Sequence, residues 1–301
     1  MPLEDVRETS NYIAAMTHGL ERIQGGFPLS LRLIREIHER LLQGGRGRDR
    51  APGEFRRSQN WIGGTRPGNA QYVPLPSQDV LEAMGALEKF LHDDPVRTPI
   101  LVKAGLAHAQ FETIHPFLDG NGRVGRLLVT LLLSAERRVL SRPMLYLSLF
   151  LKEHRDEYYR RLMAVRTDAE WEAWLRFFVE GVTEVAWSAT VTTQKIVALV
   201  DADRQRVMTL GRAAGSAGRL HDLVTRELAF TIPDAAPKLE SSEVTTGKAA
   251  AHLVDLGIVR EVTGKARNRV FVYSGYLSLL QDDQPVAEAH GRTGDVQARS
   301  S

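Results

Sequence analysis

The sequence predicts a mainly α protein, in which a large helical domain is followed by a small module of helices and a β-hairpin. Apolar residues recur at three- and four-residue spacing through most of residues 1–43 and 77–186. Residues 44–76, between these helical stretches, are rich in Gly and Pro. After about residue 190, shorter helical patterns precede two β-type runs.

Composition limits the function classes. At 301 residues, 43% of them hydrophobic and 25% charged, the chain is long enough for one large domain or two ordinary ones. A formal charge of +2 gives no overall field that favours nucleic acid or membrane. The sequence has no cysteine, which excludes disulfides and thiolate sites and fits a reducing compartment. Because no leader is recognisable and no apolar run reaches about 18 residues, we expect a cytoplasmic protein without a membrane partner.

The first domain is predicted to span residues 1–189. Two amphipathic helices fill most of residues 1–43, and a hairpin or flap is expected at about 58–74, where two apolar-aromatic runs flank a Gly/Pro/Asn-rich turn. The basic stretch 44–57 is interpreted as a solvated loop in preference to a nucleic-acid patch. Further helices are predicted over 77–93, 98–115, 123–137, 146–166 and 170–189, with a break at 141–143.

The second domain is predicted over residues 190–280. Helical patterns cover 192–210, 216–228 and 245–259, and β-type runs follow at 258–262 and 269–273. Three helices and a hairpin in about 90 residues are the outline of a winged helix. Residues 281–301 are polar, lack an apolar face and are predicted to be disordered.

Residues 115–126, "HPFLDGNGRVGR", place the most turn-prone and charged residues between two apolar helices. The turn could be a simple connection, because Asp, Gly and Asn cap helices and tolerate left-handed backbone. However, Gly120, Asn121 and Gly122 stand where a helix begins, so their N–H groups can form an anion site. Arg123 and Arg126 share one face of the first turn, and guanidinium groups fit phosphate well.

Asp119 is a carboxylate beside this expected phosphate site. A Mg²⁺ ion between the two would remove the repulsion, because Mg²⁺ binds one or two carboxylates together with phosphate oxygens. His115 is the nearby residue able to take a proton near neutral pH, although it could also be a helix cap. Phe117 is interpreted as an apolar anchor for the loop. The pattern thus predicts a phosphate, metal and base site held by two helices.

Residues 115–126 resemble the signature of the Fic family, H-x-F-x-D/E-G-N-G-R-x-x-R, and meet every specified position. The similarity extends over residues 27–186, including "PGEFRRSQNWIGG" and "LYLSLFLKEHRDEYYRRL". The resemblance implies a Fic-type helical core and an adenylyltransferase (AMPylator), which moves AMP from ATP to a Tyr, Thr or Ser hydroxyl of a protein and releases pyrophosphate.

The resemblance also implies residue roles. His115 deprotonates the target hydroxyl, Asp119 holds Mg²⁺, and Gly120, Asn121 and Gly122 line the anion hole. Arg123 supports the phosphates and Arg126 reaches the γ-phosphate. A flap holds the target backbone by strand addition, with Ile62, Gly63 and Gly64 as its candidate contacts. The alternative for these flap residues is a surface hairpin without a partner.

One family feature has no full match. Many Fic proteins restrain themselves with a helix of pattern S/T-x-x-x-E-G/N, whose glutamate pairs with the second motif arginine. Here Thr17 and Glu21 have the right spacing, but Arg22 follows. The sequence therefore looks shortened at its N-terminus, and we expect either constitutive activity or a separate inhibitory partner.

Alternatives remain for both domains. The site could transfer a phosphoryl or phosphocholine group or remove AMP, although Gly122 favours AMP transfer, because phosphoryl-transferring relatives carry lysine there. The second domain could bind DNA through Lys248, His252 and the basic stretch 264–269, so that the chain would be a regulator carrying a Fic domain. A protein–protein or autoregulatory role is favoured, since the helix is Ala-rich and apolar. Self-modification and assembly into a homo-oligomer are left open.

Overall fold

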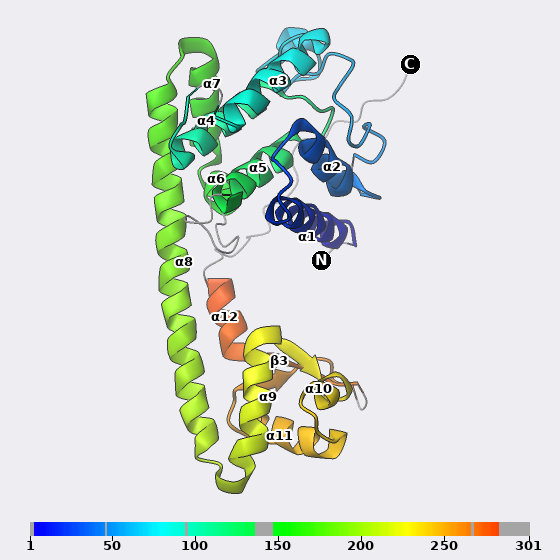
Figure 1. The fold of residues 1–301 in the computed structure, drawn as a ribbon, viewed down its shortest axis with the longest axis vertical. Coiled ribbons are helices and arrows are strands. Elements are labelled where there is room, and N and C mark those ends of the chain that lie inside the picture. The colour runs from blue at the N-terminus through cyan, green and yellow to red at the C-terminus, as the bar shows by residue number, and fades with distance from the viewer. Residues whose placement is uncertain (1–2, 46, 94–95, 136–146, 266–267, 283–301) are drawn as a thin grey trace. The chain divides into compact units, whose positions relative to one another are not determined.

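The computed structural model describes residues 3–45, 47–93, 96–135, 147–265 and 268–282. Its contacts divide the chain into two compact units, Met1–Ala186 and Trp187–Ser301 (Figure 1). The long helix α8, Trp171–Met208, has residues in both units. The other helices of the first unit are α1 (Leu3–Gln24), α2 (Leu31–Leu42), α3 (Val80–Leu91), α4 (Ile100–Ile114), α5 (Asn121–Ala135), α6 (Leu147–Glu153) and α7 (Arg155–Asp168).

The first unit is built around α5, which contacts α1, α2 and α4 (Figure 1). Helices α4 and α5 are buried on most sides, as their nearly continuous apolar sequence requires. Two glycines allow close packing on α4: a Cβ at Gly125 of α5 would lie 3.3 Å from Phe111, and one at Gly105 would lie 2.9 Å from Leu175. The core therefore fixes both helices that flank the motif turn.

A buried polar link also joins these helices. His108 of α4 is fully buried; its Nδ1 lies 3.0 Å from the carbonyl oxygen of Gly125, and its Nε2 lies 2.9 Å from the hydroxyl of Tyr158 in α7. Since a carbonyl only accepts, Nδ1 carries the proton and Nε2 accepts the tyrosine hydrogen. Burial lowers the pKa of His108 to about 4.

The predicted helices of the first unit are confirmed, with two differences. The helix expected over 146–166 is divided at His154, whose φ of −98° and ψ of 35° are not helical. The helices expected over 170–189 and 192–210 are instead the single helix α8, and no Gly or Pro interrupts residues 182–208. The break predicted at 141–143 lies outside the described residues.

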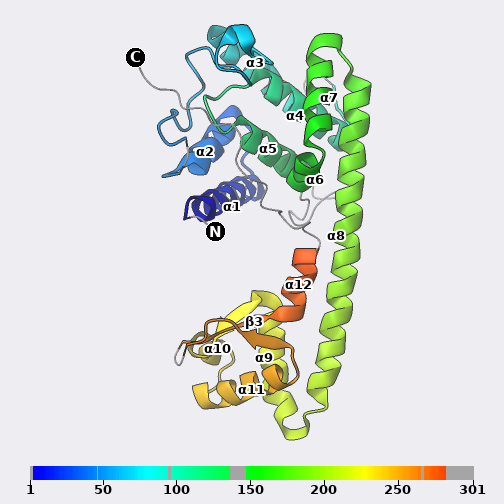
Figure 2. The same ribbon diagram turned by 180° about the vertical axis from the view of Figure 1, so that it is seen from behind.

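The second unit combines helices with a small antiparallel sheet (Figure 2). It contains η3 (Gly211–Ala213), α9 (Ala214–Glu227), α10 (Ile232–Lys238), α11 (Glu243–Asp255) and α12 (Ser274–Asp282), with strands β1 (Ala229–Thr231), β2 (Val259–Glu261) and β3 (Val270–Tyr273) in the order β1–β3–β2. Strand β1 and helices α10 and α12 were not expected from the sequence. Helix α12 includes residues 281–282, whereas the rest of the predicted disordered tail lies outside the described residues.

A buried network joins the end of α8 to this sheet. The Tyr273 hydroxyl of β3 donates to Asp203 Oδ2 at 2.7 Å, and Arg206 contacts the other carboxylate oxygen at 2.8 Å. Asp203 is 3% exposed, so these bonds satisfy a charge that would otherwise be costly to bury. The second unit therefore takes its first helical element from α8, while its assignment as a winged helix stays a prediction.

Within the described part of the chain, no helix combines the length and the apolarity needed to span a membrane.

Acid should destabilise the first unit through His108. Its pKa is lowered from about 6.5 to about 4 in the folded chain, so the unfolded chain binds more protons between those values and stability falls as the pH drops through this window. One such histidine lowers the free energy of unfolding by about 2 kcal/mol when the pH falls from 6.5 to 5. We expect His108→Gln to reduce the pH dependence of urea unfolding, whereas His92→Gln at an exposed position should not. If the free energy of unfolding depended equally on pH in both variants, this role of His108 would be contradicted.

Candidate active site

The connection between α4 and α5 begins at His115, which caps α4 in a left-handed conformation. Its φ is 51° and ψ is 60°, and its N–H donates to the Phe111 carbonyl at 2.9 Å. The following Pro116 has no N–H and cannot continue the helix. Left-handed backbone costs a non-glycine residue roughly 1–2 kcal/mol, so the surroundings must hold it. The backbone of His115 thus caps α4, while its side chain stays available to act as a base.

Arg56 is the residue that holds this cap. It is 2% exposed, and its Nε donates to the His115 carbonyl at 3.0 Å, while its own N–H donates to the Pro116 carbonyl at 2.8 Å. Its other guanidinium nitrogens donate to the carbonyls of Ser58, Leu75 and Ile114. One buried cation therefore joins the base of the flap to the start of the motif. In the sequence, Arg56 belongs to the basic stretch 44–57 and to a stretch that carries the family resemblance, and no role of its own was predicted for it.

Asn121 and Phe117 close the turn. The Asn121 side chain accepts from the Phe117 N–H at 2.9 Å and donates to the Phe117 carbonyl at 2.8 Å. The amide oxygen and the amide nitrogen of this side chain therefore both bind within the turn and fix its shape. Phe117 is fully buried and stacks on His38 with ring centroids 3.7 Å apart, which confirms its interpretation as an anchor.

His38 of α2 supports the acidic position of the motif and was missed in the sequence. The Gly53 N–H donates to its Nδ1 at 2.9 Å, so Nε2 carries the proton and donates to the Asp119 carbonyl at 3.0 Å. Burial lowers the pKa of His38 to about 4. The ring is therefore a neutral bridge between the loop after α2 and the motif turn.

The two carboxylate oxygens of Asp119 differ in their hydrogen bonding. Its Oδ1 accepts the Gly120 N–H at 2.6 Å and lies 3.6 Å from Arg123. Its Oδ2 has no hydrogen bond among the described residues, and a Cβ on Gly47 would lie 2.6 Å from it. Gly47 thus leaves the space in which this oxygen sits.

Helix α5 begins at Asn121, as expected for an anion site. Gly120 adopts a φ of 79°, which turns the chain so that the first N–H groups of α5 open onto the turn. Arg123 and Arg126 are half-buried on this first turn, and Arg126 Nη1 lies 3.3 Å from the position that a Cβ on Gly122 would occupy. Backbone dipoles and two guanidinium groups together favour a phosphate here.

The electrostatic surroundings of the His115 side chain keep its imidazole in the neutral form, which a general base must have before it can take a proton. Burial lowers its pKa to about 4, and the positive charges of Arg166 and Arg56 contribute. Its Nδ1 is buried without a hydrogen-bond partner among the described residues. The imidazole is therefore neutral at neutral pH.

Glu112 is a second residue at the site for which the sequence predicted no role. It is 6% exposed, and its Oε1 is buried without a hydrogen-bond partner among the described residues. Burial raises its pKa to about 7 against the opposing effect of Arg126 and Arg166. Its place as the single acidic residue of α4, two residues before the end of that helix and three before His115, is the signal that could have drawn attention to it.

The predicted flap is an irregular loop with one β-bridge, between Ile62 and Tyr72, not a ladder of two strands. Gly63 and Gly64 both have a φ of 69°, which turns the chain directly after Ile62. The Asn60 side chain donates to the Phe117 carbonyl at 2.9 Å, and the Tyr72 hydroxyl donates to the Thr113 carbonyl at 2.9 Å. Both arms of the flap are therefore tied to the region around the motif.

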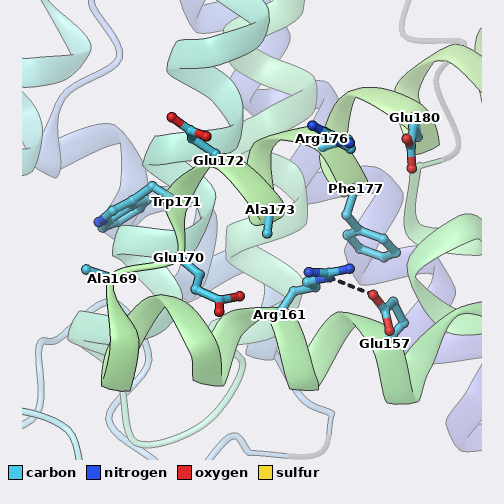
Figure 3. A pocket seen from close by; sticks show the side chains of 10 residues that line it. All are labelled: Glu157, Arg161, Ala169, Glu170, Trp171, Glu172, Ala173, Arg176, Phe177 and Glu180. Atoms are coloured by element: carbon cyan, nitrogen blue, oxygen red, sulfur yellow. Dashed lines mark hydrogen bonds and ion pairs between the residues drawn. The ribbon is translucent and has the colours of Figure 1, made fainter.

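A separate pocket of about 720 Å³ lies between α7 and α8 (Figure 3). Four glutamates and two arginines line it, and the Arg161–Glu157 ion pair, with a nitrogen–oxygen distance of 2.6 Å, lies along α7. None of its ten lining residues belongs to the motif or the flap, so it is not part of this site.

Replacing Arg56 should loosen the motif turn. Arg56→Lys keeps the charge but cannot bond all its carbonyl partners, and each buried carbonyl left unpaired costs about 1–3 kcal/mol. We expect a lower thermal midpoint and faster amide exchange at His115. The matched control is Arg57→Lys at the neighbouring exposed position, which should change neither. A midpoint equal to that of the control would argue against this role.

Known proteins match this part of the chain. The Fic/DOC family profile matches residues 28–133. The chain is 28% identical over 183 residues to the protein adenylyltransferase Fic of Drosophila erecta, a match that covers 59% of this chain and 33% of that protein. It is 35% identical over 153 residues to the protein of the same name from Aedes aegypti, covering 50% and 27% respectively. The chain thus spans about a third or less of the length of these relatives.

The fold also matches a solved structure. A Fic family protein from Desulfovibrio desulfuricans superimposes with a TM-score of 0.54 at 20% identity, covering 91% of this chain and 77% of that one. At this identity the likeness concerns the fold alone. The Fic/DOC profile match covers residues 28–133, about a third of the chain, and the complete motif at residues 115–126 lies within it.

Proposed function

We propose that this protein is an adenylyltransferase that moves AMP from ATP to a Tyr, Thr or Ser hydroxyl of a target protein and releases pyrophosphate. The observation that carries the proposal is the motif turn, in which a neutral imidazole, a helix N-terminus, two arginines and a carboxylate occur within twelve residues. The name of the Drosophila and Aedes relatives supports the same activity.

In this mechanism His115 removes the proton of the acceptor hydroxyl. The hydroxyl oxygen forms a bond to the α-phosphorus, the bond from that phosphorus to the bridging oxygen of the β-phosphate breaks, and pyrophosphate leaves with the electron pair. A neutral imidazole is ready for this step, and its low pKa means that it returns the proton readily to solvent. Positioning and charge stabilisation supply most of the catalysis.

The phosphates would lie at the start of α5. The backbone N–H groups of Asn121 and Gly122 face the transferred phosphate, Arg123 supports the phosphate chain, and Arg126 reaches the γ-phosphate. Without a bound anion, two guanidinium groups at the positive end of a helix repel each other, so a triphosphate would relieve an existing strain.

The residues present suit a Mg²⁺ ion held together with phosphate. Asp119 offers an oxygen, Oδ2, without a hydrogen bond among the described residues, and Mg²⁺ commonly takes one or two carboxylates beside phosphate oxygens. When bound, the ion would neutralise charge on the α- and β-phosphates.

The target would bind along the flap. Ile62 is half-buried, and the exposed Trp61 and Val73 lie beside the Ile62–Tyr72 bridge. An extended peptide could add to this edge and bring its hydroxyl toward His115. The target could be another protein or another copy of this chain.

Two finer proposals concern regulation. Glu21, the candidate inhibitory glutamate, is exposed on α1, so we expect either activity without restraint or a glutamate supplied by another protein. The β1–β3–β2 unit is proposed to be a winged helix that contacts protein, because the outer face of α11 carries the exposed Val244 and Val254 beside Lys248. DNA binding by this unit, phosphoryl transfer and AMP removal are less favoured, and a cytoplasmic location is expected.

The activity can be tested by intact mass. After incubation with ATP and Mg²⁺, we expect the chain, or proteins of a lysate supplied with labelled ATP, to gain AMP. His115→Ala should remove at least 99% of this gain, because the general base typically contributes about 10²–10⁴-fold. His92→Ala, at an exposed position, should retain it. Gain of a phosphoryl group, or no labelling at all, would refute the proposal.

The metal position can be tested through Gly47. Gly47→Ala places a methyl group against Asp119 Oδ2 and should reduce AMP transfer about tenfold or more and raise the Mg²⁺ concentration needed for half-maximal rate. Gly44→Ala is a matched control, since Gly44 also has a positive φ of 63° but nothing lies within 4 Å of its Cβ. Equal Mg²⁺ dependence in both variants would contradict the role of Asp119.

A further inference from the structure

We propose that Arg166 of α7 is a positioning residue that joins the target-binding flap to the end of the helix that carries His115. The inference rests on the proposed function and extends it, because it names the connection that sets the distance between the target backbone and the general base. Three observations carry it: the contacts of Arg166 with α4, its contact with the flap, and its place among the charges around His115.

On the α4 side, Arg166 holds the last turn of the helix. Its Nη2 donates to the Glu112 carbonyl at 2.8 Å, and its Nε donates to the Thr113 hydroxyl at 3.3 Å. The last carbonyls of a helix lack intrahelical donors, and a cation there also opposes the negative end of the helix dipole. Arg166 therefore fixes the backbone two and three residues before His115.

On the flap side, the same guanidinium lies over the ring of Tyr72, 3.9 Å from its centroid. The Tyr72 hydroxyl donates to the Thr113 carbonyl at 2.9 Å, so arginine and tyrosine meet at the same turn of α4. Tyr72 also forms the single bridge of the flap: the Ile62 N–H donates to its carbonyl at 2.8 Å, and its N–H donates to the Ile62 carbonyl at 3.2 Å. A continuous chain of contacts thus runs from Ile62 to Arg166 and on to α4.

Arg166 also belongs to the charged groups that surround His115. These are Arg166 from α7, Arg56 from the loop before the flap, and Asp119 from the motif turn. Both arginines disfavour the imidazolium, whereas Asp119 favours it. A single side chain therefore affects both the location of the flap and the protonation of the base.

Three variants separate this role from simple capping of α4. Arg166→Met removes both the charge and the planar guanidinium group, whereas Arg166→Lys keeps the charge without that group. Tyr72→Leu removes the partner of Arg166 in the flap and leaves the hydrogen bonds from Arg166 to α4 available. Arg160→Met is the matched control on the same helix, because the Arg160 side chain is 64% exposed and pairs only with Glu157 among the described residues. Thermal unfolding of each variant verifies that it folds.

The first readout needs no nucleotide and no activity. Amide hydrogen exchange of the free protein at Ile62 and Tyr72 should become about tenfold faster in Arg166→Met and in Tyr72→Leu, and the double variant should add little to either. His115, followed by NMR titration, should have a higher pKa in Arg166→Met and a nearly unchanged one in Arg166→Lys. Arg160→Met should match the parent in both measurements.

The second readout is AMP transfer. In Arg166→Lys and Tyr72→Leu, the KM for the protein target should rise about tenfold while the KM for ATP stays within about twofold, because the flap and not the phosphate site is loosened. Unchanged exchange at the flap in Arg166→Met, or an equal rise in both KM values, would overturn the inference. An inactive parent protein would refute the proposed function instead, and the exchange and titration results would still decide the role of Arg166.

Discussion

The site depends on the hydrogen bonds that the buried guanidinium of Arg56 donates to backbone carbonyls. Arg56 donates to the carbonyls on both sides of the motif start and to carbonyls of the flap base, so a left-handed His115 and an irregular flap are held by one side chain. Burying an arginine is costly, and desolvation lowers its pKa, but its planar fork can satisfy several carbonyls that no helix or sheet would pair. Irregular backbone, which chemistry at a loop requires, is thereby kept rigid.

Positive potential is concentrated at the motif turn, and the buried carboxyl group beside the turn carries less negative charge than an ordinary glutamate. The first turn of α5, Arg123 and Arg126 all favour an anion, while the nearest buried carboxyl, Glu112, has a pKa raised to about 7. At neutral pH that carboxyl is close to half protonated, so it opposes a phosphate less than an ordinary glutamate would. His38 and His115, with pKa values of about 4, stay neutral in the same region. Burial thus sets the protonation states that phosphate chemistry needs.

Helix α8 has residues in both units. Trp174 donates to the Gly105 carbonyl of α4 at 2.8 Å, and Asp203, nearly thirty residues further along, accepts from Tyr273 of the sheet. The same helix therefore contributes a buried side chain to each core. The composition changes near residue 190, where the residues of the first core end and those of the second begin. The helix continues through this point because helix formation depends on local propensity and not on which core a residue joins.

The sequence by itself determined the helical class, the limits of most helices and the twelve-residue motif, because periodicity and capping are local properties. It also identified Phe117 as an anchor and predicted that the helix after the motif turn begins at about residue 123, two residues after its observed start at Asn121. Only the tertiary structure decided that Arg56, His38, Glu112 and Arg166 surround the motif, since they come from four separate segments and their roles follow from burial and from carbonyls that they meet in space. It likewise reduced the expected hairpin to one bridge, because side-chain anchors from Asn60 and Tyr72, not a strand ladder, hold the flap.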